Sequence, residues 1–493
     1  MATSPVSIPG NIARRQLRTL PLVALIYFSV SGGPYGLETA ISSSGPGMTM
    51  LMLIVIPLIF SIPCALMNAE LGSAIPLQGG YYNWVKIGMG RFWGFMEGAS
   101  SWIASWLDTA LYPVLFIDYL AVWFPALERG NHSVFSLWDG AFSLDLHWLT
   151  AIAFMIPLGY LNARGSTSVG NTSIGLFVVI IAPFIVVTVL GFIHLANTPG
   201  MNPLEPFSLP DMSKMQAAGA GLGVIIWNYI GFDAVSTVGG ETEKPYRTYP
   251  LALLVSVPLI MVTYLFPVFA SLSSGLHSGE VGLWDNGDFA LVGEALGGPW
   301  LKGAIVVGAL LSQVGLFSSL LMSGSRVPAV LAADHYLPES FAEINPRTGT
   351  PVKSIILSCG IFSVFTALNF STLIDADIML NMFSISLEFL ALIALRRKYP
   401  NMVRPFKVPG GMPGAVAISV FPIALCVWII QSAWVEEPVS FWIGIVMLGG
   451  SAALYPVLNR YVKRGRPDFV HTSDTIDFGP GIDTASILAG TAR

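Results

Sequence analysis

Long apolar stretches recur along the whole sequence and limit what the chain can fold into. Each is close to or longer than the roughly 20 residues that an α-helix needs to cross the hydrocarbon core of a bilayer. They cover residues 20–42, 48–75, 92–124, 146–161, 171–195, 218–238, 250–274, 300–324, 352–368, 373–395, 413–434 and 440–458. Only 11% of residues are charged, against roughly 25% in soluble domains. The sequence therefore predicts an all-α membrane protein with about 12 transmembrane helices.

The basic residues predict how these helices are oriented. All but three of the 24 Lys and Arg residues lie before the first span, after the last, or in the loops on that same side; the exceptions are Arg129, Lys214 and Lys302. Short loops rich in Lys and Arg stay in the cytoplasm. The opposite loops are expected to hold the acids Asp285, Asp288, Asp375, Asp377, Glu436 and Glu437. We therefore expect a multi-pass protein, of the plasma membrane, with both termini cytoplasmic.

Composition divides the chain into three parts. Residues 1–18 form a polar cytoplasmic segment, and residues 19–460 hold the transmembrane domain. Residues 461–493 are rich in Gly, Asp, Ser and Thr, which offer too little apolar surface to offset the entropy of ordering a chain. We expect a disordered cytoplasmic tail there.

Two of the predicted spans contain helix breaks. Ser31–Gly36 has three glycines and a proline about 12 residues, or about 18 Å, inside the first span. Gly and Pro cost about 1 and 3 kcal/mol in a helix relative to Ala, so the helix should unwind near the bilayer midplane. A packing kink, in which small residues let helices approach, is the alternative. A second break is expected at Asn228–Asp233 in the sixth span.

The five-span spacing between the two breaks is what two inverted five-helix halves produce. In such proteins the substrate lies at the midplane, where the broken helices meet. No nucleophile motif and no metal-ligand cluster occurs, so neither an enzyme nor a bound cofactor or metal is expected. The sequence favours a carrier of a small organic solute that contacts membrane lipid and no nucleic acid.

Several motifs indicate a family. The sequence resembles the amino acid/polyamine/organocation transporter superfamily over nearly all of residues 18–460. The resemblance rests on the first break and on segments 69–72, 76–84, 231–237 and 241–245. It implies a LeuT-like fold with a five-plus-five inverted repeat and broken helices 1 and 6.

A closer resemblance concerns the substrate. Residues 30–38 and 111–120, and Glu388 ahead of Arg396, are similar to the polyamine transporters of plants and protozoa. Pro34 has no N–H, so one donor that amino acid carriers offer to a substrate carboxylate is missing. The resemblance implies secondary active transport of organic cations, foremost polyamine uptake coupled to protons. An amino acid permease or exchanger and a non-transporting nutrient sensor remain as alternatives.

Acidic residues inside the spans are costly and call for an explanation. Glu97 and Asp108 are 11 residues apart, which places them on one helical face together with Tyr112. Asp108 is the deeper of the two and is expected to face the substrate. Glu70 lies near the cytoplasmic end of its span and Asp118 near the outer end of another. We expect each of them to tether a helix end or a loop.

Two acids follow the breaks directly. Glu38 and Asp233 each open the half-helix after a break, where an acid can act as a cap through hydrogen bonding and the helix dipole. A carboxylate beside unwound backbone at the midplane can instead bind an ammonium group. We interpret Glu38 as a ligand, whereas for Asp233 capping is the stronger alternative. The predicted substrate site comprises Ser31, Gly32, Gly33, Tyr35, Gly36, Glu38, Asp108, Tyr112, Tyr229, Gly231, Phe232, Asp233 and Glu388.

Overall fold

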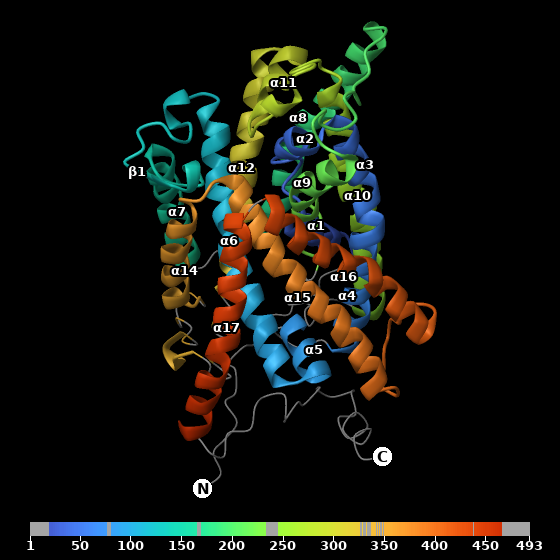
Figure 1. Cartoon of the computed structure of the whole chain (residues 1–493), viewed down its shortest axis with the longest axis vertical. Helices are drawn as coiled ribbons and strands as arrows, with labels where there is room; N and C mark the ends of the chain where they lie inside the picture. The colour runs from blue at the N-terminus through green and yellow to red at the C-terminus, as the bar shows by residue number, and fades with distance from the viewer. Residues whose placement is uncertain are drawn as a thin grey trace.

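A computed structural model shows the chain as a bundle of long helices (Figure 1). It describes residues 19–75, 80–164, 169–232, 245–325, 328, 332, 337–341, 343, 345, 348, 350–436 and 438–465. The predicted N-terminal segment and residues 466–493 of the predicted tail lie outside this part.

The first half of the chain forms α1 (Thr19–Val30), α2 (Glu38–Ser44), α3 (Pro46–Ile56), the π-helix η1 (Pro57–Ser61), α4 (Ile62–Ala74), α5 (Gly80–Met89), α6 (Arg91–Ala121), the 3-10 turns η2 (Pro125–Leu127) and η3 (Trp138–Gly140), α7 (Leu146–Ala163) and α8 (Val169–Asn197). The second half forms α9 (Lys214–Trp227), α10 (Pro245–Leu272), η5 (Val281–Leu283), α11 (Asp288–Gly297), α12 (Pro299–Gly324), η6 (Glu339–Phe341), α14 (Val352–Phe365), α15 (Phe370–Lys398), α16 (Gly411–Glu436) and α17 (Pro438–Gly465).

Eight helices of the described part are long and apolar enough to cross a membrane. They are Pro46–Ala74, Leu146–Ala163, Val178–Asn197, Pro250–Leu272, Pro299–Met322, Phe370–Lys398, Gly411–Val435 and Pro438–Arg460. The other four predicted stretches also contain helix in their described residues: α1 and α2 lie in 20–42, α6 covers most of 92–124, the greater part of α9 lies in 218–238, and α14 lies in 352–368. The prediction of a mostly helical membrane protein is confirmed.

Side-chain caps fix where several helices begin. Asp145 precedes α7 and accepts a hydrogen bond of 2.8 Å from the backbone N–H of Trp148. Ser213 precedes α9 and forms a reciprocal capping box with Gln216. These caps satisfy backbone donors that have no partner within the helix.

A short hairpin marks one end of the bundle. Strands β1 (Phe135–Leu137) and β2 (Phe142–Leu144) pair antiparallel, with Phe135 opposite Leu144. Figure 1 shows β1 and α11 at this end, which we call the hairpin end, and α5 at the opposite end, which we call the α5 end.

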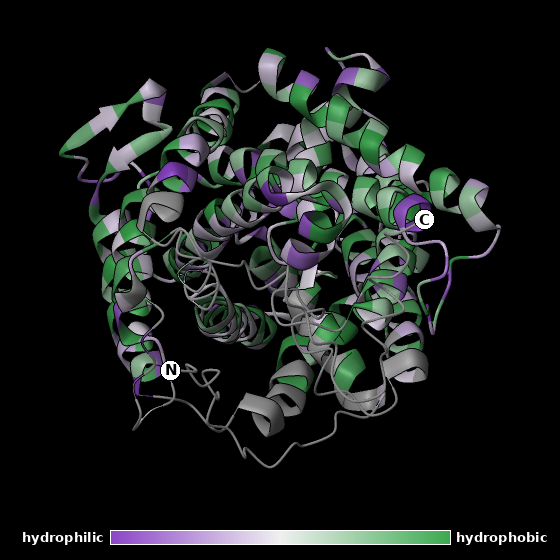
Figure 2. Ribbon diagram, turned by 90° about the horizontal axis from the view of Figure 1, so that it is seen from below, coloured by the Kyte–Doolittle hydropathy of each residue, from purple (hydrophilic) through white to green (hydrophobic). Residues whose placement is uncertain are grey.

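The helices α6 and α15 form the centre of the bundle. They pack along each other, α6 also packs on α12, α1 packs on α10, and α2 packs on α9. Figure 2, seen from the α5 end, shows hydrophobic positions on helices all round the bundle. Large apolar side chains such as Ile156, Ile185 and Val446 are exposed there, as a lipid-facing surface requires.

Candidate functional site

The first predicted break is confirmed. Residues 31–37 are not helical and separate α1 from α2. Gly33 and Gly36 have φ angles of +98° and +87°, a conformation that is costly for residues with a Cβ. The backbone N–H of Gly33 donates to Ser31 Oγ at 3.2 Å. The glycines therefore allow the chain to turn where α1 ends.

Three other elements enclose this break. The Gly32 carbonyl accepts a 2.6 Å hydrogen bond from Ser312 Oγ on α12. A Cβ on Gly36 would lie 3.0 Å from the Phe370 ring and 3.3 Å from the Trp227 ring. The break thus lies between α12, the start of α15 and the end of α9.

Tyr35 contacts three helices. Its hydroxyl donates to the Ile305 carbonyl on α12 at 3.2 Å. Its ring packs edge-on against Tyr119 and Phe184, with ring centroids 5.1 Å apart in both pairs. These contacts anchor the break to α6, α8 and α12.

Glu38 is fully buried and joins three segments. Its Oε2 accepts a 2.8 Å hydrogen bond from the backbone N–H of Gly36. Its Oε1 accepts from the Tyr119 hydroxyl and, at 3.3 Å, from the backbone N–H of Gly287 just before α11. These bonds hold Glu38 to the break, to α6 and to the segment before α11, whereas the N-cap residue of α2, Leu37, makes no side-chain capping bond. Within the described residues Oε2 accepts one hydrogen bond, and a carboxylate oxygen can accept two.

The second break begins where α9 ends at Trp227. Gly231 has a φ of +108°, Tyr264 Oη donates to the Asn228 carbonyl at 3.0 Å, and Tyr229 Oη donates to the Leu53 carbonyl at 2.9 Å. The α-helix therefore ends where the break was predicted, and residues 228–232 are not helical. Asp233 lies outside the described residues.

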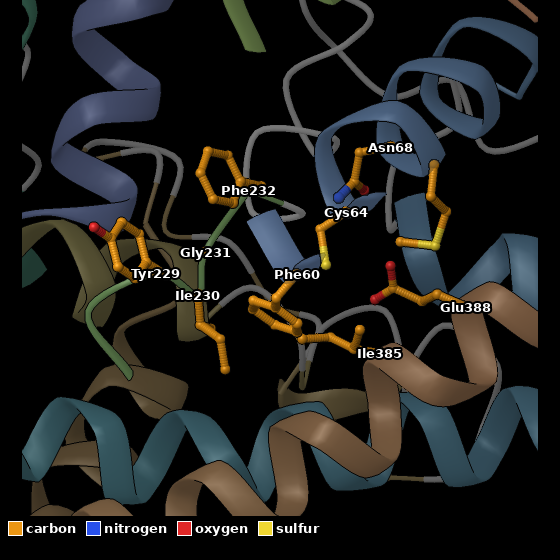
Figure 3. A pocket seen from close by; sticks show the side chains of 10 residues that line it. Phe60, Cys64, Asn68, Tyr229, Ile230, Gly231, Phe232, Ile385 and Glu388 are labelled. Carbon is orange, nitrogen blue, oxygen red and sulfur yellow. The ribbon is translucent and has the colours of Figure 1, made fainter. Parts of the chain in front are cut away.

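A small cavity lies beside the second break (Figure 3). Its volume is about 10 Å³, roughly room for one water molecule. It brings together four of the predicted site residues, Tyr229, Gly231, Phe232 and Glu388. Figure 3 shows Glu388 reaching from α15 toward Cys64 on α4.

Asp108 lies near the middle of α6 and contacts the end of α9. Its Oδ1 accepts hydrogen bonds from Tyr112 Oη at 3.2 Å and from Trp227 Nε1 at 3.0 Å. Glu97, closer to the α5 end, accepts a 2.9 Å bond from Ser101 Oγ. The predicted polar face of α6 is confirmed, and its Asp108 end meets the residue at which the second break starts.

Asp377 is not among the predicted site residues. It was expected in a loop with Asp375, but both lie inside α15, and Asp377 is 0% exposed. Its Oδ1 accepts a 2.8 Å hydrogen bond from Asn381 Nδ2. The spacing of Asp377, Asn381, Ser384 and Glu388 was the available signal, because intervals of three and four residues place them along one side of a helix.

Asp118 tethers a helix end, as predicted. At the hairpin end it accepts from Asn286 Nδ2 at 3.0 Å and lies 2.9 Å from His147 Nε2. Nearby, His277 Nε2 lies 3.1 Å from Asp288 Oδ2. Burial raises the pKa of the Asp288 carboxyl, and its hydrogen bonds to Asp285 N–H and to His277 oppose that rise.

Glu70 is also a tether, at the α5 end. Its carboxylate accepts two hydrogen bonds from Arg396, a 2.7 Å bond from the backbone N–H of Val408, and lies 3.2 Å from Arg404 Nε. It therefore fastens α4 to the end of α15 and to the loop that follows.

Known proteins share this sequence over most of its length. A family model described as amino acid permease matches residues 17–450. Polyamine transporter RMV1 of Arabidopsis thaliana is 33% identical over 94% of this chain and 89% of its own, and polyamine transporter PUT1 of Oryza sativa subsp. japonica is 35% identical over 93% and 81%. The vacuolar cationic amino acid transporter 8 of Arabidopsis thaliana is 26% identical over 80% and 65%. With a helix break at residues 31–37 and a match that spans nearly all of the bundle, this chain belongs to the amino acid permease family, a family of transporters and not of enzymes.

Proposed function

We propose that this protein is a secondary active transporter of organic cations, with polyamine uptake coupled to protons as its main activity. Relatives named as polyamine transporters are 33% and 35% identical along at least nine-tenths of the chain, which supports the same substrate class here. Uptake of a dication also gains about 4.6 kcal/mol per 100 mV of inside-negative potential, twice the value for one charge.

The position of Asp108 carries the proposal. This acid lies in the middle of a membrane helix, hydrogen-bonded to Trp227, and the Trp227 ring in turn lines the first break at Gly36. The basic residues of α6, α9 and α15 lie at helix ends, at Arg91, Lys214 and 396–398. A half-buried carboxylate beside both breaks suits an ammonium group, since a charge that is partly removed from water is stabilised by an opposite charge.

Engaged backbone amides argue against an α-amino acid as the main substrate. The N–H of Gly33 donates to Ser31, the N–H of Gly36 donates to Glu38, and Pro34 has none. A substrate carboxylate would have to displace these internal bonds before it could use either glycine amide. An ammonium group instead needs acceptors, and Glu38 Oε2 and Asp108 provide them.

The other predicted site residues complete the proposed path. Contacts with the surrounding helices keep the first break unwound, so that its backbone can meet the substrate. The residues of this break are Ser31, Gly32, Gly33 and Tyr35. Tyr112 flanks the ammonium group at Asp108. Tyr229, Gly231, Phe232 and Glu388 line the small cavity toward the α5 end, and Asp233 follows them in the chain.

The proposed architecture is the LeuT-like one. All twelve predicted stretches cross the membrane as a five-plus-five inverted repeat followed by α16 and α17. Residues 1–18 and 461–493 flank the domain of residues 19–460 in the cytoplasm, and the membrane is the plasma membrane. Single cysteines placed at positions 464 and 288 check this topology. An impermeant thiol reagent added on one side of the membrane should label only one of the two positions.

Purified protein in liposomes tests the function. We expect wild-type protein to exchange radiolabelled putrescine in a counterflow assay, faster with an inward proton gradient, and to bind leucine weakly. Asp108→Asn should raise the Kd for putrescine about tenfold or more, since a hydrogen bond to a charged group contributes about 1.5–3 kcal/mol. Asp118→Asn, on the same helix, is the matched control and should change this Kd less than threefold.

Two results would contradict the proposal. Tight leucine binding with no putrescine binding would make the protein an amino acid permease or exchanger, the alternative that the similarity to a cationic amino acid transporter supports. Putrescine binding without any flux would make it a non-transporting sensor.

A further inference from the structure

The relative position of α6 and α15 can be read from one contact. Helix α15 begins at the hairpin end, where Asn369 N–H donates to the Ala141 carbonyl at 2.8 Å, and it ends beside α5. Helix α6 begins directly after α5, so the two helices run antiparallel. Near their middle, Ser101 Oγ donates to Ser384 Oγ at 3.2 Å.

This contact places Asp108 and Asp377 at the same height. Asp108 lies seven residues after Ser101 in α6, and Asp377 lies seven residues before Ser384 in α15. Seven residues make two helical turns less about 20°, with a rise of about 10 Å. Because the helices are antiparallel, both acids lie about 10 Å from the serine contact toward the hairpin end, on the faces that α6 and α15 turn toward each other.

The two carboxylates form an unbalanced pair. The register at Ser101 and Ser384 places Asp377 and Asp108 at the same height on facing sides of α15 and α6, where two negative charges repel each other. Asp377 Oδ2 is buried and has no hydrogen-bond partner among the residues that the structure describes. A buried charged oxygen without a partner is costly, and a second carboxylate beside it raises that cost. Both observations indicate that a cation belongs between these helices.

We infer that Asp377 and Asp108 together hold one ammonium group of a diamine whose other ammonium group lies at the first-helix break. This inference rests on the proposed function and narrows its substrate class to compounds with two ammonium groups on a short alkyl chain. The Trp227 indole joins the two positions, because its Nε1 donates to Asp108 while its ring lies against Gly36. Tyr112 packs on the same indole, with ring centroids 6.1 Å apart, so the alkyl chain meets apolar ring surface.

The test compares ligands that differ in one charge. Putrescine and n-butylamine have the same carbon chain, but only putrescine has a second ammonium group. Wild-type protein should bind putrescine at least tenfold more tightly than n-butylamine. Asp377→Asn should raise the Kd for putrescine about tenfold or more and change that for n-butylamine less than threefold. Asn keeps the acceptor for Asn381 and removes only the charge.

Matched variants separate charge from folding. Asp375→Asn makes the same replacement on the same helix and should leave both Kd values within twofold of wild type. Asp377→Glu keeps the charge and should restore most of the preference for putrescine. The comparison of the two amines on wild-type protein needs no variant and tests the inference even if Asp377→Asn does not fold.

Each contrary result has a distinct meaning. Equal wild-type affinities for the two amines, or an unchanged putrescine Kd in folded Asp377→Asn, would overturn the inference while leaving Asp108-dependent polyamine transport intact. Loss of stimulation by a proton gradient in Asp377→Asn, with the ratio of the two Kd values unchanged, would also overturn it, because the pair would then share a proton. Failure of wild-type protein to bind any amine would instead refute the proposed function.

Discussion

Replacing Glu70 with Gln is expected to lower the free energy of unfolding by about 3–5 kcal/mol, because it removes one partner of a buried ion pair. Glu70 is 0% exposed and Arg396 is 6% exposed. The replacement leaves Arg396 and Arg404 without the carboxylate that neutralises them, and it turns one acceptor oxygen into an NH2 donor that faces the donors Arg396, Arg404 and Val408 N–H. The loop after α15 should detach from α4.

Thermal unfolding of detergent-purified protein, followed by size-exclusion chromatography, measures this effect. Glu343→Gln is the matched control, because Glu343 lies 2.7 Å from Lys353 in an exposed pair. Exposed pairs contribute about 1 kcal/mol or less, so the control should unfold close to the wild-type temperature. Equal unfolding temperatures for Glu70→Gln and wild type would show that the buried network does not stabilise the fold.

Replacing Glu38 with Gln is expected to raise the Kd for putrescine about tenfold or more. If Glu38 Oε2 accepts a hydrogen bond from the substrate ammonium group, losing its charge removes about 1.5–3 kcal/mol. Gln also replaces one acceptor oxygen of Glu38 with an NH2 donor. Gly36 N–H, Gly287 N–H and the Tyr119 hydroxyl all donate to this carboxylate, so one of these donors loses its acceptor. Binding of putrescine and leucine to purified wild-type and variant protein measures the change.

Tyr119→Phe distinguishes a role of Glu38 in binding substrate from a role in holding the break alone. This variant removes one donor to Glu38 and keeps the carboxylate charge. If Glu38 binds the ammonium group, Tyr119→Phe should affect the putrescine Kd much less than Glu38→Gln does. Equal losses of putrescine affinity in the two variants, or no loss in Glu38→Gln, would show that Glu38 only holds the break in place.

Features that depend on local chemistry were predictable from the sequence. The dense Gly and Pro content of residues 31–36 makes a continuous helix costly there, and the chain does unwind at this point. Helical periodicity alone predicts that Asp108 and Tyr112 lie on one face of α6. Helix-end acids such as Glu70 and Asp118 were correctly identified as tethers because their depth in the span can be read from the sequence.

Contacts between distant segments were not predictable in this way. Gly287 donates to Glu38 from 249 positions along the chain, and nothing in either local sequence encodes that approach. Asp377 was assigned to a loop because hydropathy places charges at the ends of an apolar stretch. Its burial depends on the packing of α15 against α6, which only the folded chain determines. The π-helix at Pro57–Ser61 was not predicted either.

The surroundings of Gly36 restrict how the substrate preference of this carrier can change by mutation. Its φ of +87° disfavours any residue with a Cβ, and that Cβ would meet Phe370 and Trp227. A larger residue at position 36 therefore requires a smaller one at 370 or 227 as well as a different backbone path. Since Trp227 also holds Asp108, single substitutions at these positions disturb several contacts at once. Selection for a longer or shorter amine must therefore act through combined substitutions or through positions outside this cluster.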